Sequence, residues 1–249
     1  MKRLLIVLPM IVPVNVLADA SIDLGVEQFR WREKGFGVTE DGQRLSLGAG
    51  WQQEGHRGLG YAGRVYSGAV DYSGKTWDRQ PLQTHSDYLG WRHEIRWFYR
   101  PEAAPGGFAL EPILAVGYEG WMRKIRAAGA AVGVREDYEV AFVRAGVTAT
   151  RSGWSLAGGI KQPWWARESS HLKNAGFSND VTFSLRGRTT LYAEIACRLT
   201  PHWRLAAGYD GYRFKQSDSK TTIAGNTVFT LIQPATVADT VTVRAEYRF

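Results

Sequence analysis

The sequence predicts an all-β fold, a single closed antiparallel transmembrane β-barrel of ten strands, with eight strands as the alternative. Apolar and polar residues alternate with a period of two over long runs, as between Val237 and Phe249, and successive side chains of a strand point to opposite faces. These runs last roughly 10 to 14 residues, whereas soluble strands usually have about 5 to 6 and a tilted membrane-crossing strand needs about 9 to 11. Aromatic residues such as Trp51, Trp97 and Trp203 stand near the ends of the apolar runs, as amphipathic rings do at bilayer interfaces.

The composition excludes several classes of protein. The chain has 249 residues, a formal net charge of +7 and one Cys, so it cannot form an intramolecular disulfide framework or a zinc site with several Cys ligands. Past residue 20 no apolar run reaches the ~18 residues that a membrane-spanning helix needs, which excludes a helical membrane protein. Aromatic residues make up 12% of the chain, whereas disordered proteins contain few of them.

Residues 1–20 have the features of an export signal. Lys2 and Arg3 form a charged start, the stretch from Leu4 to Leu17 is apolar, and Ala18-Asp19-Ala20 is a small-x-small cleavage motif. The apolar stretch is too short to act as a stop-transfer helix. We therefore expect a signal peptide over residues 1–20, cleavage near Ala20, and one barrel domain over residues 21–249.

The alternation breaks in two of the expected strands. Phe29 leaves the parity of Leu24 in the first strand, and Phe142 shares the parity of Arg144 in the sixth. A soluble β-sandwich would also alternate, with its apolar face inward and its charged face in water. The length of the runs and the aromatic residues near their ends favour the membrane barrel.

The end of the chain carries a resemblance to a known class of proteins. The terminal Ala245-Glu246-Tyr247-Arg248-Phe249 ends in Phe with apolar residues at every second position before it. It resembles the C-terminal signature of small Gram-negative outer-membrane β-barrel proteins. The resemblance implies that Tyr247 and Phe249 belong to a segment recognised by the barrel-assembly machinery, and that the protein lies in the outer membrane of a Gram-negative bacterium. The strand count resembles that of omptin proteases and certain adhesins, which is a likeness of architecture alone.

The connections between the strands alternate in length. Long connections include 163–187 and 215–237, and short ones include Arg151-Ser152-Gly153. Outer-membrane barrels place short turns in the periplasm and long loops outside, so both termini are expected on the periplasmic side. The strands are expected at residues 21–32, 44–53, 58–71, 87–100, 108–122, 138–150, 154–162, 188–199, 203–214 and 238–249.

Charged residues of the inward parity are expected to fill the lumen. A barrel of eight to ten strands has an interior nearly filled by its side chains, and a buried charge without a partner costs several kcal/mol. We therefore expect a network of arginines and carboxylates that largely blocks the passage, with a narrow porin-like channel as the alternative. The expected network comprises Arg92, Glu94, Arg96, Glu111, Glu119, Arg144, Glu194, Asp210, Arg244 and Glu246.

Three residues are candidates for catalytic chemistry: His85, Asp87 and Asp210. His85-Ser86-Asp87 is the one close grouping of His, Ser and Asp, but neighbouring side chains of a strand point apart, which separates His85 from Ser86 as a base–nucleophile pair. Omptins use an Asp/His pair and an acidic pair at the top of the barrel, and outer-membrane lipid A deacylases use a spaced His/Ser pair; neither motif is present. The sequence therefore favours a protein that is not an enzyme, with a surface hydrolase acting on lipid A or peptides as an alternative.

The partners expected from the sequence are lipids. No cofactor or metal is expected, since no cluster of His, Asp and Glu has ligand spacing. Nucleic acid is not expected, because the basic residues are spread over strands and loops. Arg123, Lys124 and Arg126 form a cluster at the expected extracellular rim, where charge-assisted bonds to lipopolysaccharide phosphates are one hypothesis and plain solvation is the alternative.

Two long loops complete the prediction. Pro163-Trp164-Trp165 opens one of them and is expected to fold back over the barrel mouth, with an exposed binding surface as the alternative. Val228-Phe229-Thr230-Leu231-Ile232 in the other is expected to extend a hairpin beyond the membrane. The predicted function is that of an integral outer-membrane barrel that acts without catalysis, through its extracellular loops or as a structural component of the membrane.

Overall fold

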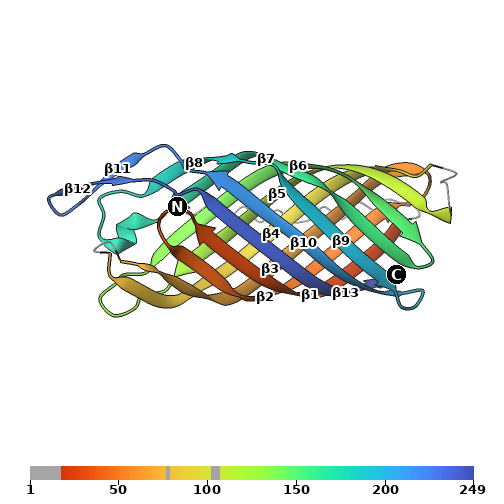
Figure 1. The fold of residues 1–249 in the computed structure, drawn as a ribbon, viewed down its shortest axis with the longest axis horizontal. Coiled ribbons are helices and arrows are strands. Elements are labelled where there is room, and N and C mark those ends of the chain that lie inside the picture. The colour runs from red at the N-terminus through yellow and green to blue at the C-terminus, as the bar shows by residue number, and fades with distance from the viewer. Residues whose placement is uncertain (1–17, 77–78, 102–106) are drawn as a thin grey trace.

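The computed structural model describes residues 18–76, 79–101 and 107–249. Its largest sheet contains β1 (Ala18–Glu33), β2 (Val38–Gln53), β3 (Arg57–Lys75), β4 (Pro81–Tyr99), β5 (Ala109–Ile125), β6 (Val134–Arg151), β7 (Trp154–Ser170), β8 (Val181–Gly187), β9 (Thr190–Arg198), β10 (Trp203–Lys215) and β13 (Thr236–Arg248). All pairings are antiparallel, and β13 pairs with both β10 and β1, so the sheet returns to its first strand as a ring (Figure 1). Because β8 and β9 share one position between β7 and β10, the ring has ten positions. The prediction of an all-β, ten-stranded antiparallel ring is confirmed.

The strands are longer than the sequence predicts. β3 and β4 each have 19 residues, and most of the expected loop 72–86 belongs to them. Likewise β7 continues to Ser170, and β8 and the short 3-10 helix η2 (Leu172–Ala175) occupy much of the expected loop 163–187. The second long loop does contain a hairpin, formed by β11 (Lys220–Ala224) and β12 (Thr227–Leu231). The ring is therefore extended towards the side of the long connections.

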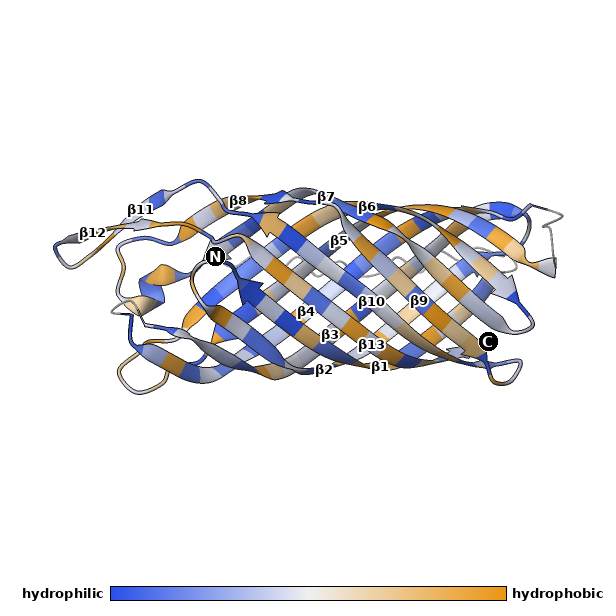
Figure 2. Cartoon of the chain, viewed as in Figure 1, coloured by the Kyte–Doolittle hydropathy of each residue, from blue (hydrophilic) through white to orange (hydrophobic). Residues whose placement is uncertain are grey.

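The outward face of the ring is apolar in one zone and charged in the next. On β1, Leu24 is 64% exposed, whereas Arg30 and Arg32 point outward further along the same strand. We call the outward apolar zone the belt, and Figure 2 shows its hydrophobic residues alternating with hydrophilic ones along the strands. The belt comprises Ile22, Leu24, Val26, Leu45, Leu47, Val65, Leu89, Ile95, Leu114, Val116, Val143, Leu156, Ile160, Leu191, Ile195, Leu205, Val241 and Val243.

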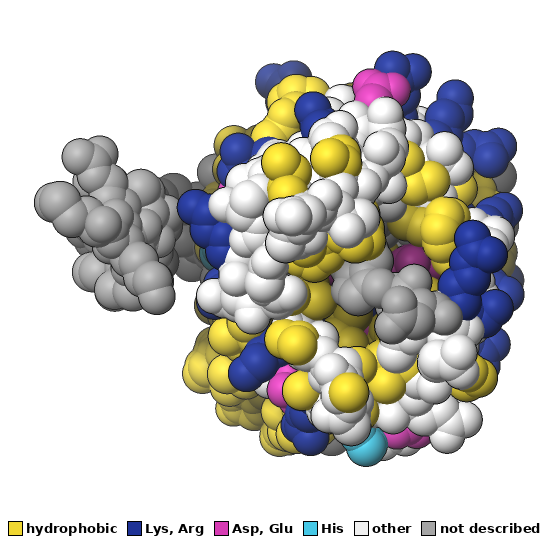
Figure 3. Space-filling view, turned by 90° about the vertical axis from the view of Figure 1, so that its left-hand side faces the viewer, with side chains coloured by type: hydrophobic (Ala, Val, Ile, Leu, Met, Phe, Trp, Pro, Cys, Tyr) yellow, Lys and Arg dark blue, Asp and Glu magenta, His cyan; other side chains and the backbone are white. Residues whose placement is uncertain are grey.

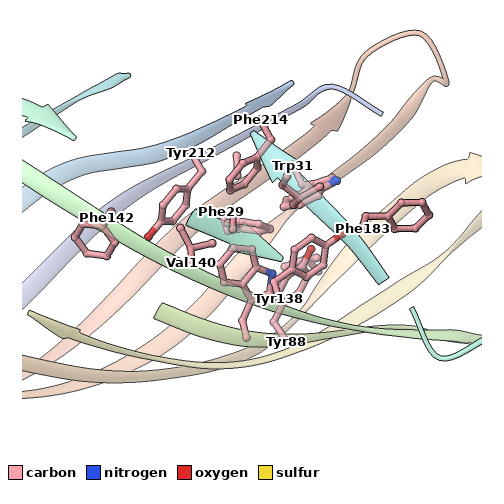
Figure 4. Close-up of a cluster of buried hydrophobic side chains, with 14 of the residues drawn as sticks. Phe29, Trp31, Tyr88, Tyr138, Val140, Phe142, Phe183, Tyr212 and Phe214 are labelled. Atoms are coloured by element: carbon pink, nitrogen blue, oxygen red, sulfur yellow. The ribbon is translucent and has the colours of Figure 1, made fainter. Parts of the chain in front are cut away.

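The inside of the ring shows the opposite change. Within the belt the inward residues are mostly charged or small, but beyond it, towards the long connections, they are aromatic (Figure 4). Trp121 stacks on Tyr138 with ring centroids 4.9 Å apart, and Trp31 meets Tyr138 edge-on at 5.4 Å. Each such pair contributes about 0.5–1.5 kcal/mol beyond the burial of its area. We call this zone the upper barrel, and its core includes Phe29, Trp31, Tyr88, Trp121, Tyr138, Val140, Phe183, Tyr212 and Phe214.

This inversion explains the two breaks in the alternation. Phe29 and Phe142 point inward, where they are buried, although Leu24 and Val143 point outward into the belt. Along such a strand the apolar residues move from the outward positions to the inward positions. The switch occurs where the strand leaves the belt, whose outside is apolar, and enters the upper barrel, whose inside is apolar. The described residues contain no helix that is long and apolar enough to cross a membrane.

Candidate functional site: the charged lumen

A layer of charged side chains crosses the lumen at the level of the belt, centred on Asp210 of β10. Its carboxylate accepts a hydrogen bond from Arg92 Nη1 at 2.6 Å, forms an ion pair with Lys161 Nζ at 2.5 Å, and also contacts Arg144. Arg92 bridges onward to Glu119, with Nη2 and Oε2 2.6 Å apart. Lys161 has no solvent-exposed area. Strands β4, β5, β6, β7 and β10 are thus joined across the interior, and we call these residues the ionic layer.

Aromatic hydroxyls complete the ionic layer. Tyr212 donates to Glu119 Oε2 at 2.6 Å and Tyr66 to Oε1 at 2.8 Å. Lys161 Nζ lies 3.5 Å from the centre of the Tyr212 ring, a favourable cation–π arrangement. Glu119 is therefore bound on both oxygens, as a buried carboxylate must be if its burial is not to destabilise the fold.

A second charged cluster lies in the upper barrel around Arg123, and the predicted contact of this residue with lipopolysaccharide is wrong. Arg123 is only 1% exposed and points into the ring, so it cannot face lipopolysaccharide. Its guanidinium contacts Glu40 at 2.8 Å, Glu136 at 2.7 Å and Glu33 at 3.3 Å. Burial alone would lower the pKa of Arg123, but these carboxylates hold that pKa well above its ordinary value. The sequence does not predict these three glutamates as part of a site, because they lie at strand ends beyond the strands that its alternation indicates.

Glu168 adjoins this cluster without a cation of its own. It is buried, Ser170 Oγ donates to its Oε1 at 2.8 Å, and its Oε2 has no partner among the described residues. Burial, followed by the charge of Glu136, raises the pKa of Glu168 well above its ordinary value. Burial likewise raises the pKa of Glu33, against the opposing charge of Arg123. Around Arg123 the upper barrel therefore contains more buried carboxylates than cations.

On the other side of the ionic layer the lumen widens into a cavity of about 700 Å³ that reaches the short turns at Gly153 and His202. We call this cavity the vestibule. Two ion-paired groups line it: Glu194 binds Arg204 at 2.8 Å and Arg244 at 2.5 Å, and Glu111 binds Arg100 at 2.5 Å.

The structure places the ten expected lumen residues inside the ring and pairs most of them. Arg92, Glu119, Arg144, Asp210 and Glu94 belong to or adjoin the ionic layer, where Arg144 Nη1 lies 3.2 Å from Glu94. The other five line the vestibule: Glu111, Glu194, Arg244, Glu246 and Arg96. Among these ten, Arg96 is the residue without an ion pair to the described part of the chain, and its guanidinium donates to the side chain of Gln52.

The candidate catalytic residues do not converge. His85 Nε2 lies 3.2 Å from Asp71 Oδ1, and both side chains are exposed on the outer wall. Asp87 is on the same wall and is bound by Arg126 at 2.5 Å, which lowers the pKa of Asp87 through the hydrogen bond and the charge. Asp210 is on the inside, in the ionic layer, so it cannot act with His85 on one substrate atom.

The remaining sequence-predicted positions lie on the outer wall. Lys124 is exposed there, as is Arg126 with its partner Asp87. Trp164 is 66% exposed and Trp165 39% exposed, and Trp165 stacks beside Tyr118 at 6.3 Å on the outer face of β5. The prediction that this pair folds over the barrel mouth is therefore wrong, because the strand β7 continues through it and turns the rings outward.

Comparisons with known proteins identify the fold. No protein-family model matches the chain, and no curated protein matches it in sequence. The structure is similar to the outer membrane protease OmpT from Escherichia coli, with 12% identity, a TM-score of 0.53, and coverage of 93% of this chain and 96% of that one. It is also similar to the attachment invasion locus protein Ail of Yersinia pestis, with 13% identity, a TM-score of 0.40 and coverage of 93% and 99%. For Neisserial surface protein A the identity is 10%, the TM-score 0.39 and the coverage 92% and 97%.

At these identities the likeness concerns the fold and no activity. The resemblance first suggested by the C-terminal residues is confirmed at that level, and no subfamily is identified. The chain therefore has the outer-membrane β-barrel fold that OmpT has.

Proposed function

We propose that this protein is a closed, non-conducting barrel of the Gram-negative outer membrane, exported by a signal peptide cleaved near Ala20. It acts without catalysis, through its extracellular end or as a structural component of the membrane. The belt lies in the hydrocarbon of the bilayer and the upper barrel stands above it. The short turns face the periplasm, as in other barrels of this class.

The ionic layer is the observation that carries this proposal. Asp210 and Glu119 form ion pairs with side chains from opposite walls of the ring, namely Arg92 and Lys161. These contacts join charged groups and are therefore strong. Between this layer and the upper-barrel core lies a cavity of about 50 Å³, which is room for a few water molecules. An ion crossing the barrel would have to break several buried ion pairs and displace packed aromatic rings.

Single-channel recording in a planar bilayer tests the proposal. The refolded mature protein is expected to give no stable conductance steps, because both barriers remain in place. Insertion is checked on the same sample by the shift in gel mobility between folded and heat-denatured protein. Reproducible steps of one amplitude would instead establish the narrow channel.

The outer wall of the upper barrel is the proposed contact with lipopolysaccharide. Arg186, Arg188 and Lys215 are exposed where β8 meets β10, just beyond the belt, and Figure 3 shows Lys and Arg side chains around the rim of this end. Among them, Arg186 has an acidic neighbour only at 3.9 Å, Asp218. Exposed cations beside the outer leaflet favour the phosphates of lipid A and the inner core.

Lipopolysaccharide retention tests this contact. Replacing Arg186, Arg188 and Lys215 together by Gln is expected to lower the lipopolysaccharide that co-purifies with the protein. Arg57→Gln with Arg151→Gln serves as the control, because these exposed arginines lie beside the short turns. Equal retention in both variants would remove the proposal.

The alternative function is a surface hydrolase, and two His–carboxylate pairs are the observation that favours it. His171 Nε2 lies 2.6 Å from Asp137 Oδ2, which is a second His–carboxylate pair in addition to the one formed by His85 and Asp71. In the strand register Asp71 lies opposite Asp41 and Asp137 lies opposite Ser169. Asp41 is bound by Arg30 at 2.6 Å, and Ser169 contacts Thr182. Peptide cleavage and lipid A mass analysis are expected to show no activity; activity lost in His171→Ala or His85→Ala would establish the enzyme.

A further inference from the structure

The vestibule is a blind pocket with an excess of cations. Nine arginines and seven carboxylates line it, and its inner end is the ionic layer. Asp19 is one of the seven, and it lies upstream of the expected cleavage at Ala20, so the mature protein has one carboxylate fewer. A cavity of about 700 Å³ is within the range that holds a small-molecule ligand.

Two of these arginines, Arg96 and Arg198, have no ion pair with a described carboxylate; Arg198 is exposed to solvent, whereas Arg96 is half-buried. Arg96 Nη2 donates to Gln52 Oε1 at 3.0 Å, and the described chain places no carboxylate within 4 Å of its guanidinium. Gln52 in turn donates from Nε2 to Glu111 Oε2 at 3.4 Å, so the amide is held with its oxygen towards Arg96. A half-buried guanidinium that has only a neutral acceptor is the group in this lumen whose charge is least compensated.

The nearby carboxylates are committed elsewhere. Glu94, on the same face of β4, binds Arg144 at 3.2 Å, and Glu111 binds Arg100 at 2.5 Å. Three residues of the cavity wall also carry buried polar atoms with no partner in the described part of the chain: the Nε atoms of Arg64 and Arg96 and the hydroxyl of Tyr192. Each of these groups can donate a hydrogen bond, so the wall has donors without acceptors.

We propose that the vestibule binds a small multivalent oxyanion from the periplasm, carrying phosphate or carboxylate groups, with Arg96 as its principal contact. A guanidinium binds two oxygens of such a group with parallel hydrogen bonds, which gives both energy and orientation. The ligand supplies the acceptors that the wall lacks. This site is separate from the proposed contact with lipopolysaccharide, because it opens on the opposite side of the barrel.

Calorimetric titration of the mature protein in detergent at low salt tests the site. Inorganic pyrophosphate and citrate are the two probes, which distinguish a phosphate ligand from a carboxylate ligand. Saturable binding of either one is expected, with an affinity that falls as salt is added. Arg96→Gln is expected to weaken binding about tenfold or more, since the variant loses a charge-assisted hydrogen bond to the ligand.

A second variant tests whether the uncompensated charge of Arg96, and not only the presence of its side chain, is needed for binding. Gln52→Glu keeps Arg96 and supplies an internal carboxylate 3.0 Å from it, so this variant is also expected to bind the probe more weakly. Lys124→Gln, on the outer wall, is the matched control and is expected to bind like the original protein. Absence of saturable binding for both probes, or equal binding in Arg96→Gln and the original protein, would overturn the site.

Discussion

Two arginines illustrate how position, and not residue type, determines the role of a side chain. Arg123 and Arg126 are three residues apart, yet one is buried among Glu33, Glu40 and Glu136 and the other lies on the outer wall with Asp87. Arg123→Met leaves three carboxylates without their shared cation, and we expect the free energy of unfolding to fall by about 3–5 kcal/mol. Urea unfolding in lipid vesicles measures this loss. Arg126→Met is the control and is expected to change stability little, because that pair is exposed.

Glu168 predicts an unusual dependence of stability on pH. Because burial raises its pKa in the folded state, its contribution is fully present below the ordinary carboxyl pKa and is lost as the pH rises through the raised value. The upper barrel is thus expected to resist unfolding better at about pH 5 than at about pH 8. Glu168→Gln should raise stability at the higher pH and flatten this part of the profile. An unchanged profile in that variant would assign the effect to Glu33, whose pKa burial also raises.

At the scale of the element, β7 contains a gap in its backbone pairing with the next strands of the ring. Hydrogen bonds of one side chain bridge this gap. Between Lys161 and Ala166 this strand has no ladder pairing to β8 or β9. Gln162 bridges the gap, since its Oε1 accepts from Thr189 Oγ1 at 2.6 Å and its Nε2 donates to Gly187 O at 3.4 Å. Gln162→Leu leaves these groups unpaired and is expected to cost about 1–3 kcal/mol. A double-mutant cycle with Thr189→Val measures the coupling; full additivity would show that the contact does not close the wall.

The strands also show which part of the structure a sequence can predict. Within the belt the alternation of Leu45, Leu47 and their neighbours is unbroken, because lipid lies on one side and charge on the other, and those strands were predicted. Beyond the belt the polarity reverses, so the period-two pattern shifts parity at Phe29 and the extension appears as loop. Lys161 was missed although it shares the inward parity of Ala157, and that parity was the signal that could have found it. The pairing of Arg123 with Glu40 has no local signal, since its partners are far apart in sequence.

For the whole molecule, the ionic layer and the upper-barrel core are two barriers in series. Asp210→Ala with Glu119→Ala removes the acceptors that hold Arg92, Arg144 and Lys161 across the lumen, but leaves the aromatic core in place. This variant is therefore expected to remain non-conducting in a planar bilayer, although it is less stable.

Removing the core alone should also leave the passage shut. Trp31→Ala with Tyr138→Ala opens space in the upper barrel, where both rings are buried, yet the charged layer below still spans the lumen. Only the fourfold variant is expected to show conductance, because an ion then meets neither a packed aromatic zone nor a ring of mutually bound charges. Conductance in either double variant would show that the two zones do not act independently, and that one of them alone keeps the lumen shut.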